Sequence, residues 1–495
     1  MPIMDEPTSL DPQIADSNSE KLVAANCYEG LVRIMADGTI GKGVATDWNI
    51  SDDGLTYTFK LRNNSHWAMF SGHKAVLGEN YEDTFDITVK AEDFKFGIER
   101  TLSEQTGSAD APLFSAVKSI STPDDFTIVF NLSYADDNFL YALTNPGAMP
   151  CDEEFFNLTN GKYGLDAKYL LCNGPFHVSK WTEKTSVKLA KNNEYNGESS
   201  VSPSSVTFYI NNDDSEVADK MNSVTYDVAF LSSSQFSSIE NKKDLNSVAI
   251  QNVTYSFIFN QNDNNYRNKN MRLAFCRSCD TSSLFDSQSD ISKADGIVPP
   301  SCKIGGEDYR NGNAAELLSY DETLAKKNFN DALLELGSSS VETTILCTEQ
   351  YEPFVKQMVQ KLQKTLGVKF VSTVKVVSES DLEAAVNDGN YSVAFYPFKA
   401  KSSFAGEIIE GFDQNNIFGY ESDVLSQKIR NIKNNSGSLE GERSAVADAE
   451  NYLVSEAVIM PVFYENSYFV TSKKTSGIYF YSSADNVCFI NAKKS

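Results

Sequence analysis

The chain has 495 residues, 41% of them hydrophobic, and a formal net charge of −25 at pH 7. This length exceeds the size at which one hydrophobic core usually keeps growing, so we expect two or three domains. The negative charge argues against nucleic acid and anionic membrane surfaces as partners, because both would be repelled. The sequence contains no run of 18 or more apolar residues and therefore predicts no transmembrane helix.

The first half of the chain predicts a capped helix followed by half-buried strands. Residues 8–31 read TSLDPQIADSNSEKLVAANCYEGL, in which an extended Asp-Pro segment precedes an Asp, Ser and Asn-rich helix cap. Residues 56–61 and 126–132 alternate apolar and polar side chains, as strands with one buried face do. Between 120 and 126, Pro123 and the two aspartates after it predict a turn.

The second half predicts a β-α-β-like unit. Apolar residues recur at three and four positions over 320–336 and 353–366, which indicates two helices. Gly337 and Gly367 follow these helices and supply the left-handed stop. Residues 368–377 then read as a strand. The chain thus alternates strands and helices without internal repeats.

Motifs in a fixed order along the chain resemble bacterial extracellular solute-binding proteins of the oligopeptide and dipeptide type, family 5. The quoted likenesses are LDP at 10–12, EGL at 29–31, DGLTYTFKLR at 53–62, AEDF at 91–94, NGPF at 173–176, NNEY at 192–195, FN at 259–260 and MRLAF at 271–275. No single motif is specific, but their order and spacing together are. The resemblance implies an importer-linked binding protein.

The resemblance implies an α/β, two-lobed periplasmic-binding-protein-like fold of class II, cluster C type, with a hinge of crossing strands. Lobe 1 is then discontinuous and comprises 1–50, 165–258 and 462–495. A smaller inserted domain occupies 51–164, and lobe 2 occupies 259–461. Composition does not mark these boundaries independently.

A family member of this kind captures a short peptide or peptide-like solute between its lobes and delivers it to an ABC transporter permease. A ligand that contacts both lobes favours their closed state. The alternative is the same fold binding a non-peptide solute, such as an anionic small molecule, an oligosaccharide or a metal chelate. A remote alternative is an exported hydrolase, but no spacing singles out a catalytic carboxylate pair, and the three histidines lie in unrelated contexts. We expect no enzyme activity, catalytic residue, cofactor or metal.

The resemblance also implies export. We expect a monomer that works outside the cytoplasmic membrane, as a cell-surface lipoprotein or in the periplasm. The chain lacks a basic start followed by an apolar stretch, so we expect that a signal peptide has been removed and that membrane attachment uses a lipid anchor absent from this sequence.

The sequence departs from the family where a peptide's amino terminus would be held. Peptide binders carry an aspartate there, whereas residues 393–404 read VAFYPFKAKSSF, with two lysines and no carboxylate. One interpretation is that Lys399 or Lys401 binds a carboxylate or other anion of the ligand; the alternative is that both lysines are solvated loop residues. The aromatic side chains assigned to the pocket here are Phe395, Tyr396 and Phe404.

Other candidate ligand contacts come from loops that face the lobe boundary in the family. They are Asp16, Asn18, Asn416 and Tyr420. Asn and Asp at such positions more often cap helices or form turns than contact a ligand.

Eight cysteines allow many pairings that the sequence does not choose between. We expect a disulfide between Cys151 and Cys172, which flank the return into lobe 1. Cys276 and Cys279 form a CxxC motif, but no second CxxC or histidine pair lies near it in the sequence, and it falls on a predicted helix. It is therefore expected to pack as apolar residues.

Overall fold

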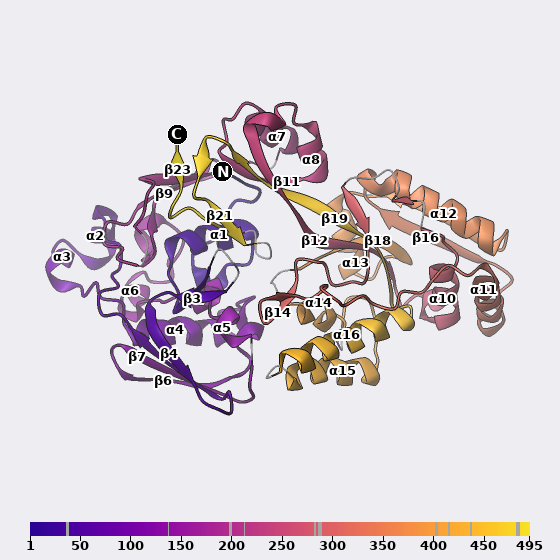
Figure 1. Ribbon diagram of the computed structural model, residues 1–495, viewed down its shortest axis with the longest axis horizontal. Helices are drawn as coiled ribbons and strands as arrows, with labels where there is room; N and C mark the ends of the chain where they lie inside the picture. Colours follow the sequence, from indigo (N-terminus) through magenta and orange to yellow (C-terminus); the bar gives the residue numbers. More distant parts are fainter. Residues whose placement is uncertain are drawn as a thin grey trace. The chain divides into compact units, whose positions relative to one another are not determined.

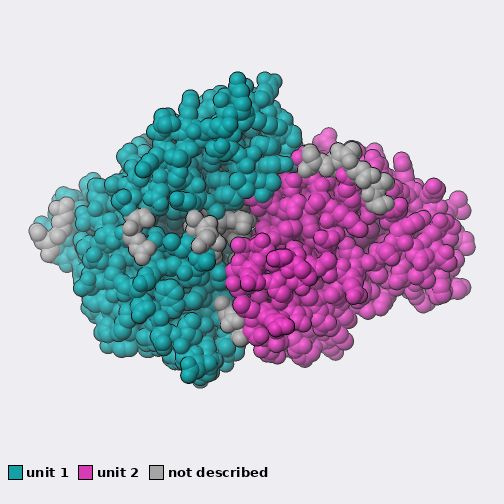
Figure 2. All heavy atoms as spheres, in the orientation of Figure 1, with its two compact units in different colours: residues 1–249, 468–495 teal, residues 250–467 magenta. Residues whose placement is uncertain are grey.

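The chain forms two compact units, which Figure 2 colours separately. The structure is a computed structural model, and it describes residues 1–495 apart from 36–38, 137, 198–199, 212, 282–283, 286–289, 401–403, 414–415, 436–437 and 482–485. Unit 1 comprises 1–249 and 468–495, and unit 2 comprises 250–467. Both boundaries fall inside long strands, β12 (Leu245–Phe259) and β19 (Ile459–Ser472), so the chain passes between the units twice. The finer division, with an inserted domain at 51–164, stays a prediction.

Unit 1 contains two four-stranded sheets (Figure 1). The first has the order β1-β10-β9-β8 and the second β4-β5-β7-β6. Their strands are β1 (Pro2–Ile3), β4 (Ala45–Ile50), β5 (Thr56–Leu61), β6 (Val117–Asp124), β7 (Thr127–Leu132), β8 (Phe176–Thr182), β9 (Ser186–Lys191) and β10 (Ser205–Ile210). Shorter strands are β2 (Val32–Ile34), β3 (Ile40–Lys42), β11 (Val228–Ser232), β20 (Thr475–Ser476), β21 (Tyr479–Tyr481), β22 (Asn486–Cys488) and β23 (Lys493–Lys494).

The helices of unit 1 are mostly short. They are α1 (Asn18–Cys27), α2 (Lys74–Leu77), α3 (Tyr81–Thr84), α4 (Ala91–Leu102), α5 (Phe139–Ala142), α6 (Glu153–Leu158), α7 (Asp214–Asn222) and α8 (Ser233–Ser238). Of the helices in the described ranges of the whole chain, none is long and apolar enough to cross a membrane.

Unit 2 is built on a sheet in which β12, β18, β16 and β17 lie in that order, with β13 pairing with β19. The strands are β13 (Ile291–Lys293), β14 (Lys303–Ile304), β15 (Glu307–Asp308), β16 (Val341–Cys347), β17 (Phe370–Val376) and β18 (Val393–Lys399). The helices are α9 (Asn264–Arg267), α10 (Lys269–Arg277), α11 (Glu322–Leu336), α12 (Glu352–Leu366), α13 (Glu379–Asn387), α14 (Gly406–Glu410), α15 (Asp423–Asn434) and α16 (Leu439–Ser455).

Both faces of the unit 2 sheet are buried, as alternate residues of its strands show. Phe257 and Phe395 pack into one hydrophobic core with residues of α10, α11 and α12. Ile258 and Ala394, each next to one of these residues in its strand, pack into a second core with residues of α13, α14, α15 and α16. A central sheet covered by helices on both faces is typical of α/β folds.

Several elements predicted from local sequence patterns are present in the structure. The strand predicted over 56–61 is β5, and the β-α-β unit is β16-α12-β17, with parallel pairing of β16 and β17. Gly337 ends α11 at φ 63°. In the predicted turn, the Asp124 carboxylate accepts hydrogen bonds from Phe126 N at 2.9 Å and Thr127 Oγ1 at 2.8 Å.

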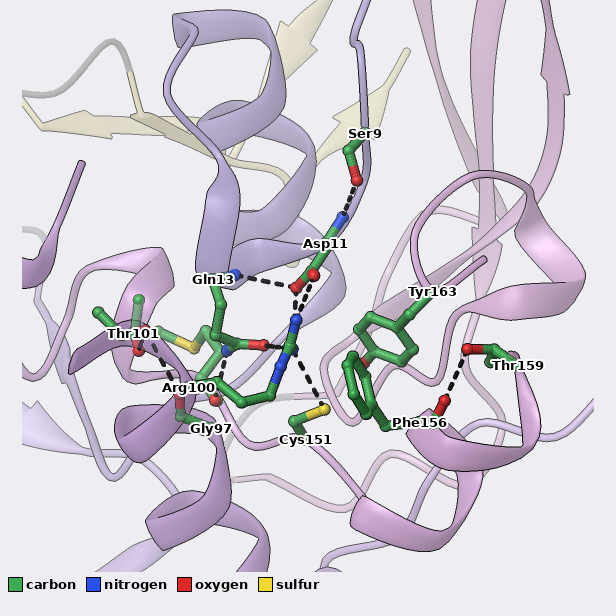
Figure 3. Close-up of polar contacts among 12 residues, drawn as sticks. Ser9, Asp11, Gln13, Gly97, Arg100, Thr101, Cys151, Phe156, Thr159 and Tyr163 are labelled. Carbon is green, nitrogen blue, oxygen red and sulfur yellow. Dashed lines mark hydrogen bonds and ion pairs between the residues drawn. The ribbon is translucent and has the colours of Figure 1, made fainter. Parts of the chain in front are cut away.

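A buried ion pair joins the Asp-Pro segment to α4 (Figure 3). Arg100 Nη2 lies 2.6 Å from Asp11 Oδ2, and the two side chains are only 11% and 5% exposed. Arg100 Nη1 also donates to Gln13 Oε1 at 2.6 Å and to Cys151 Sγ at 3.5 Å. The ring of Phe156 lies 4.1 Å from the guanidinium carbon. The charges of Asp11 and Arg100 are therefore compensated away from water.

A second buried pair in unit 1 joins Glu29 to Arg62. Tyr195 OH donates to Glu29 Oε1 at 3.2 Å, and Arg62 Nη1 donates to the Gly43 carbonyl at 2.6 Å. Asn173 completes the arrangement, because its side chain accepts from Glu29 N at 3.0 Å and donates to Glu29 O at 2.8 Å. Glu29, Arg62, Asn173 and Tyr195 belong to four separate motifs of the family resemblance, so those motifs meet here.

In unit 2, the buried Arg272 organises the backbone through carbonyl groups. Its guanidinium donates to the carbonyls of Tyr266 at 2.7 Å, Arg267 at 2.9 Å, Ala457 at 3.0 Å and Glu456 at 3.1 Å. Burial lowers the pKa of Arg272. These contacts connect α10 to the turn before β19.

His73 anchors the segment that follows Trp67 in unit 1. Its side chain is fully buried, and its Nε2 lies 3.1 Å from the Leu170 carbonyl. Its Nδ1 is buried with no hydrogen-bond partner among the described residues, which suits an unprotonated nitrogen. Burial lowers the pKa of His73 to about 4. Phe70 packs between His73 and His177, at centroid distances of 4.3 Å and 5.5 Å.

We expect Arg100→Met to lower the free energy of unfolding of unit 1 by about 3–5 kcal/mol, because Asp11 would keep a buried charge without its partner. Unfolding in urea is followed by tryptophan fluorescence, since Trp48, Trp67 and Trp181, the three tryptophans of the chain, all lie in unit 1. Lys74→Ala, also in unit 1, removes an ion pair with Glu79 whose side chains are 44% and 86% exposed, and serves as a control expected to change stability by less than about 0.5 kcal/mol. A double variant with Asp11→Asn should recover part of the loss; full additivity of the two changes would contradict this account.

The stability of unit 1 should fall as the pH drops from 6.5 towards 4. In this window a histidine of the unfolded chain takes up a proton, whereas buried His73 does not, so acid favours unfolding. The full effect is on the order of 3 kcal/mol at and below pH 4. Urea midpoints measured by tryptophan fluorescence across this range should show a shallower decline for His73→Gln than for the parent chain. Equal slopes in the two proteins would show that His73 titrates normally.

Candidate ligand-binding residues

Strand β18 presents its alternate side chains to two different environments. Its register with β12 is antiparallel and pairs Phe395 with Phe257, Tyr396 with Ser256 and Lys399 with Val253. Among the described residues, β16 pairs with β18 only at Val393 and Ala394. The later part of β18 is therefore hydrogen-bonded as a strand by β12 on one side, which also explains why Pro397, lacking an N–H, is tolerated there.

Phe395 is a core residue of unit 2. It is 1% exposed, and rings of Tyr255, Phe257, Tyr351 and Phe463 surround it at centroid distances between 4.9 Å and 5.7 Å. This position argues against the predicted ligand contact, so Phe395 is better explained as packing. The sequence could not separate it from Tyr396, because neighbouring strand residues point to opposite faces.

Three of the predicted aromatic residues gather on the other face of the sheet. Tyr396, Phe404 and Tyr420 are partly buried and pack against the same core. Phe398, two positions after Tyr396, belongs to this group; its ring lies 5.6 Å from Tyr396 and 5.7 Å from Phe412, which stacks on Phe418 at 4.7 Å. We call Tyr396, Phe398, Phe412 and Phe418 the aromatic cluster. Strand periodicity applied to Tyr396 would have identified Phe398, which the sequence reading missed.

Asn416 holds the loop that carries Phe418. Its amide nitrogen donates to the carbonyls of Phe412 at 3.2 Å and Asp413 at 2.8 Å, and to that of Tyr420. Its amide oxygen accepts from Phe418 N at 3.1 Å and Tyr420 N at 3.2 Å. These bonds occupy both ends of the side chain, so the loop-forming alternative describes Asn416 better than direct ligand contact.

Tyr420 is tied to α16 by its hydroxyl, which donates to Tyr452 OH at 3.3 Å. Burial, followed by the interaction with Tyr452, raises the pKa of Tyr420. Lys399 ends β18 with an exposed side chain. Lys401 lies outside the described residues. The assignment of an anion to these two lysines stays a prediction.

The unit 1 candidates Asp16 and Asn18 flank the cap of α1. Ser17 is the N-cap residue, and Glu20 completes a capping box with it. The Glu20 carboxylate accepts from Thr8 N at 2.7 Å, Thr8 Oγ1 at 2.8 Å, Asp16 N at 3.0 Å and Ser17 N at 3.1 Å. Burial acts to raise the pKa of Glu20, but these donors outweigh it and leave the pKa lowered. Asp16 itself has an exposed side chain. The loop before α1 is thus fixed by Glu20, a residue the sequence reading did not select.

The disulfide predicted between Cys151 and Cys172 is absent. All eight cysteines, each among the described residues, are free thiols. Cys151 instead accepts a hydrogen bond from Arg100, and burial raises its pKa to about 12. Cys172 lies beside the Cys27 thiol. Sequence spacing could not reveal these partners, because both arise from long-range packing.

Across the described part of the chain, no group of three or more His, Cys, Asp or Glu side chains is arranged to hold a metal ion. Cys276 is buried in α10 and Cys279 lies just after it; both belong to the hydrophobic core that contains Phe395. The Cys279 Sγ atom lies 3.1 Å from Met358 Sδ. The CxxC motif is therefore a packing element.

Comparison with known proteins identifies the class. The family model described as "Bacterial extracellular solute-binding proteins, family 5 Middle" matches residues 39–418, so the chain belongs to this family. It is 24% identical over 496 residues to the dipeptide-binding protein DppE of Bacillus subtilis (strain 168), covering 96% of this chain and 88% of DppE. The resemblance predicted from the motifs is confirmed.

Solved structures share the fold. The dipeptide-binding protein from Pseudoalteromonas sp. SM9913 in complex with Met-Leu aligns with a TM-score of 0.78 at 17% identity, covering 100% of this chain and 99% of that one. The protein AgaA of A. tumefaciens R10 in complex with agropinic acid aligns with a TM-score of 0.73 at 18% identity, covering 99% of this chain and 97% of that one. The predicted two-lobed α/β fold is thereby confirmed.

Asn416→Ala should destabilise the loop at 416–420 by about 1–3 kcal/mol, because partly buried backbone groups would lose their partners. Hydrogen exchange of this segment should therefore accelerate in the protein without added ligand. Gln427→Ala, which removes an exposed side-chain bond to Asn431, is the matched control and should leave exchange unchanged. Unaltered exchange in Asn416→Ala, combined with weaker ligand binding, would instead assign Asn416 a direct ligand contact.

Proposed function

We propose that this protein captures a short peptide or peptide-like solute and delivers it to the permease of an ABC transporter. The observation that carries the proposal is the family match over 39–418, supported by similarity along nearly the whole length of a dipeptide-binding protein. We also propose that it is not an enzyme, that it works outside the cytoplasmic membrane as a monomer, and that a lipid anchor attaches it. The predicted domain division, with lobe 2 at 259–461 and an insert at 51–164, belongs to the same proposal.

Two features of unit 2 support an extended, carboxylate-bearing ligand. The end of β18 is paired by β12 on one side, and extended peptides bind proteins by adding backbone hydrogen bonds to such strands. Lys399 places a positive charge at this strand end, in a chain with a net charge of −25. A cation favours a carboxylate over an ammonium group, since like charges near a protein surface repel.

The absence of a carboxylate from 393–404 bears on how the ligand is oriented. In our proposal the ligand's carboxylate meets Lys399 or Lys401, and its amino terminus is held elsewhere. Tyr396 and Phe398 supply apolar surface beside this point, and Asp16 stays a separate candidate ligand contact of unit 1.

A non-peptide anion is the second candidate. The same two lysines favour it, and the likeness to AgaA, solved with agropinic acid, shows that one protein of this fold holds such a molecule. Oligosaccharides and metal chelates have weaker support, because no feature of the described residues favours them over a carboxylate.

Native mass spectrometry of freshly purified protein, followed by denaturation and fragmentation of the released molecules, tests the proposal. A ladder of peptide masses is the expected outcome. One non-peptide anionic mass would favour the second candidate, and turnover of peptides or chromogenic glycosides by the pure protein would contradict the binding role.

The double variant Lys399→Ala/Lys401→Ala should weaken binding of the identified ligand by about tenfold or more, because a charge-assisted contact would be lost. Isothermal titration calorimetry provides the dissociation constants. Lys375→Ala, which removes an exposed lysine of β17, is the control and should bind as the parent does. Equal affinities of all three proteins would leave both lysines as solvated residues.

A further inference from the structure

The end of α1 and the segment before β8 run side by side in unit 1. The Gly174 N–H donates to the Cys27 carbonyl at 2.9 Å. One step further on, the Asn173 side chain accepts from the backbone N–H of Glu29 and donates to its carbonyl, at 3.0 Å and 2.8 Å. A methyl group built on Gly174 would lie 2.6 Å from the Cys27 carbonyl carbon. This distance is too short for a side chain, so the two backbones are in direct contact and position 174 requires glycine. These contacts hold Cys27 and Cys172 on neighbouring segments.

Burial first, and then the neighbouring Cys172 thiol, raise the pKa of Cys27, which places the two thiols next to each other. Cys27 is 0% exposed and Cys172 is 1% exposed. The Cys172 backbone is also fixed from its other side, because its carbonyl accepts from Ala68 N at 2.7 Å. Disulfides need two backbones within about 7 Å and side chains that face each other. Neighbouring hydrogen-bonded segments that carry two adjacent thiols favour both conditions.

Each of the remaining cysteines of unit 1 has different neighbours. The Cys151 Sγ atom accepts a hydrogen bond from Arg100 Nη1 at 3.5 Å. Cys488 lies on β22, whose neighbouring Val487 carbonyl accepts from the Asn26 side chain at 2.8 Å. Cys27 is the thiol that lies beside Cys172.

We propose that Cys27 and Cys172 form a disulfide bond when the chain folds in the presence of a disulfide oxidant. The two thiols lose two protons and two electrons as the new S–S bond forms. The oxidant, a small-molecule disulfide such as oxidised glutathione or the disulfide of an oxidoreductase, takes up both and is released as two thiols. The exchange passes through a mixed disulfide between the oxidant and one of the two cysteines.

Burial of the two thiols determines the stage of folding at which this bond forms. Exchange requires a thiolate that can reach the oxidant, and burial together with the neighbouring Cys172 raises the pKa of Cys27 well above its usual range. The native thiols are therefore protected from both oxidation and alkylation. The bond forms during folding, before β8 closes over the end of α1, and afterwards it is equally protected from reduction.

The test uses the full-length chain, unfolded and reduced, then refolded in parallel with a mixture of reduced and oxidised glutathione or with reduced glutathione alone. Free thiols are blocked by alkylation in denaturant, and peptides are mapped by mass spectrometry without reduction. The expected product of oxidative refolding carries six alkyl groups on its eight cysteines and yields one linked peptide pair containing Cys27 and Cys172. Eight alkylated cysteines, or a linked pair that joins Cys172 to Cys151, would overturn the proposal.

Stability provides a second readout. A bond between these positions closes a long loop and should raise the midpoint of unit 1 unfolding, followed by tryptophan fluorescence on heating, by roughly 5 °C or more relative to the reduced protein. Cys27→Ala should abolish the difference between oxidatively and reductively refolded protein, whereas Cys151→Ala should retain it. If Cys27→Ala does not fold, the peptide map of the unmodified chain alone decides the question.

Discussion

The requirement that buried charges be compensated organises unit 1 around the Asp11–Arg100 pair. An unpaired carboxylate or guanidinium at this depth would be strongly destabilising. Burial of both charges therefore requires the Asp-Pro segment and α4 to stay in contact. Gln13 and Cys151 extend the same contact to a third part of the chain. Three regions distant in sequence thus meet at the Arg100 guanidinium group. The loop before α1, which Glu20 fixes through the capping box, directly follows the Asp-Pro segment of this pair.

The motifs that revealed the family are, in this structure, mainly contacts of the scaffold. Asp11 bonds to Arg100, Glu29 to Arg62 and Tyr195, and Arg272 to the carbonyls that precede β19. Such pairs demand specific residue types at fixed places, and for that reason the sequence was sufficient to predict the family, the α/β class and elements such as β5, α11 and α12. Their ends followed local rules, as the left-handed Gly337 illustrates.

The candidate ligand residues were predictable only in part, because their roles depend on tertiary packing. A strand pattern alone does not say which face of β18 meets which core, so the sequence does not separate the buried Phe395 from Tyr396 and Phe398 on the opposite face. Asn416 was found as a residue of interest, yet its hydrogen bonds show that it acts on its own loop. Thiol partners have no local signature at all. Cys172 meets Cys27 through the pairing of two segments, which no spacing of cysteines in the sequence encodes.

The double passage of the chain through β12 and β19 has a consequence for the order in which the protein is completed. Unit 2 is a continuous stretch, 250–467, whereas unit 1 needs residues 468–495, including β22 beside α1. During synthesis or export from the amino terminus, every residue of unit 2 has therefore emerged before unit 1 receives its last strands. Unit 2 can therefore complete its fold first, whereas unit 1 stays incomplete until residues 468–495 have emerged.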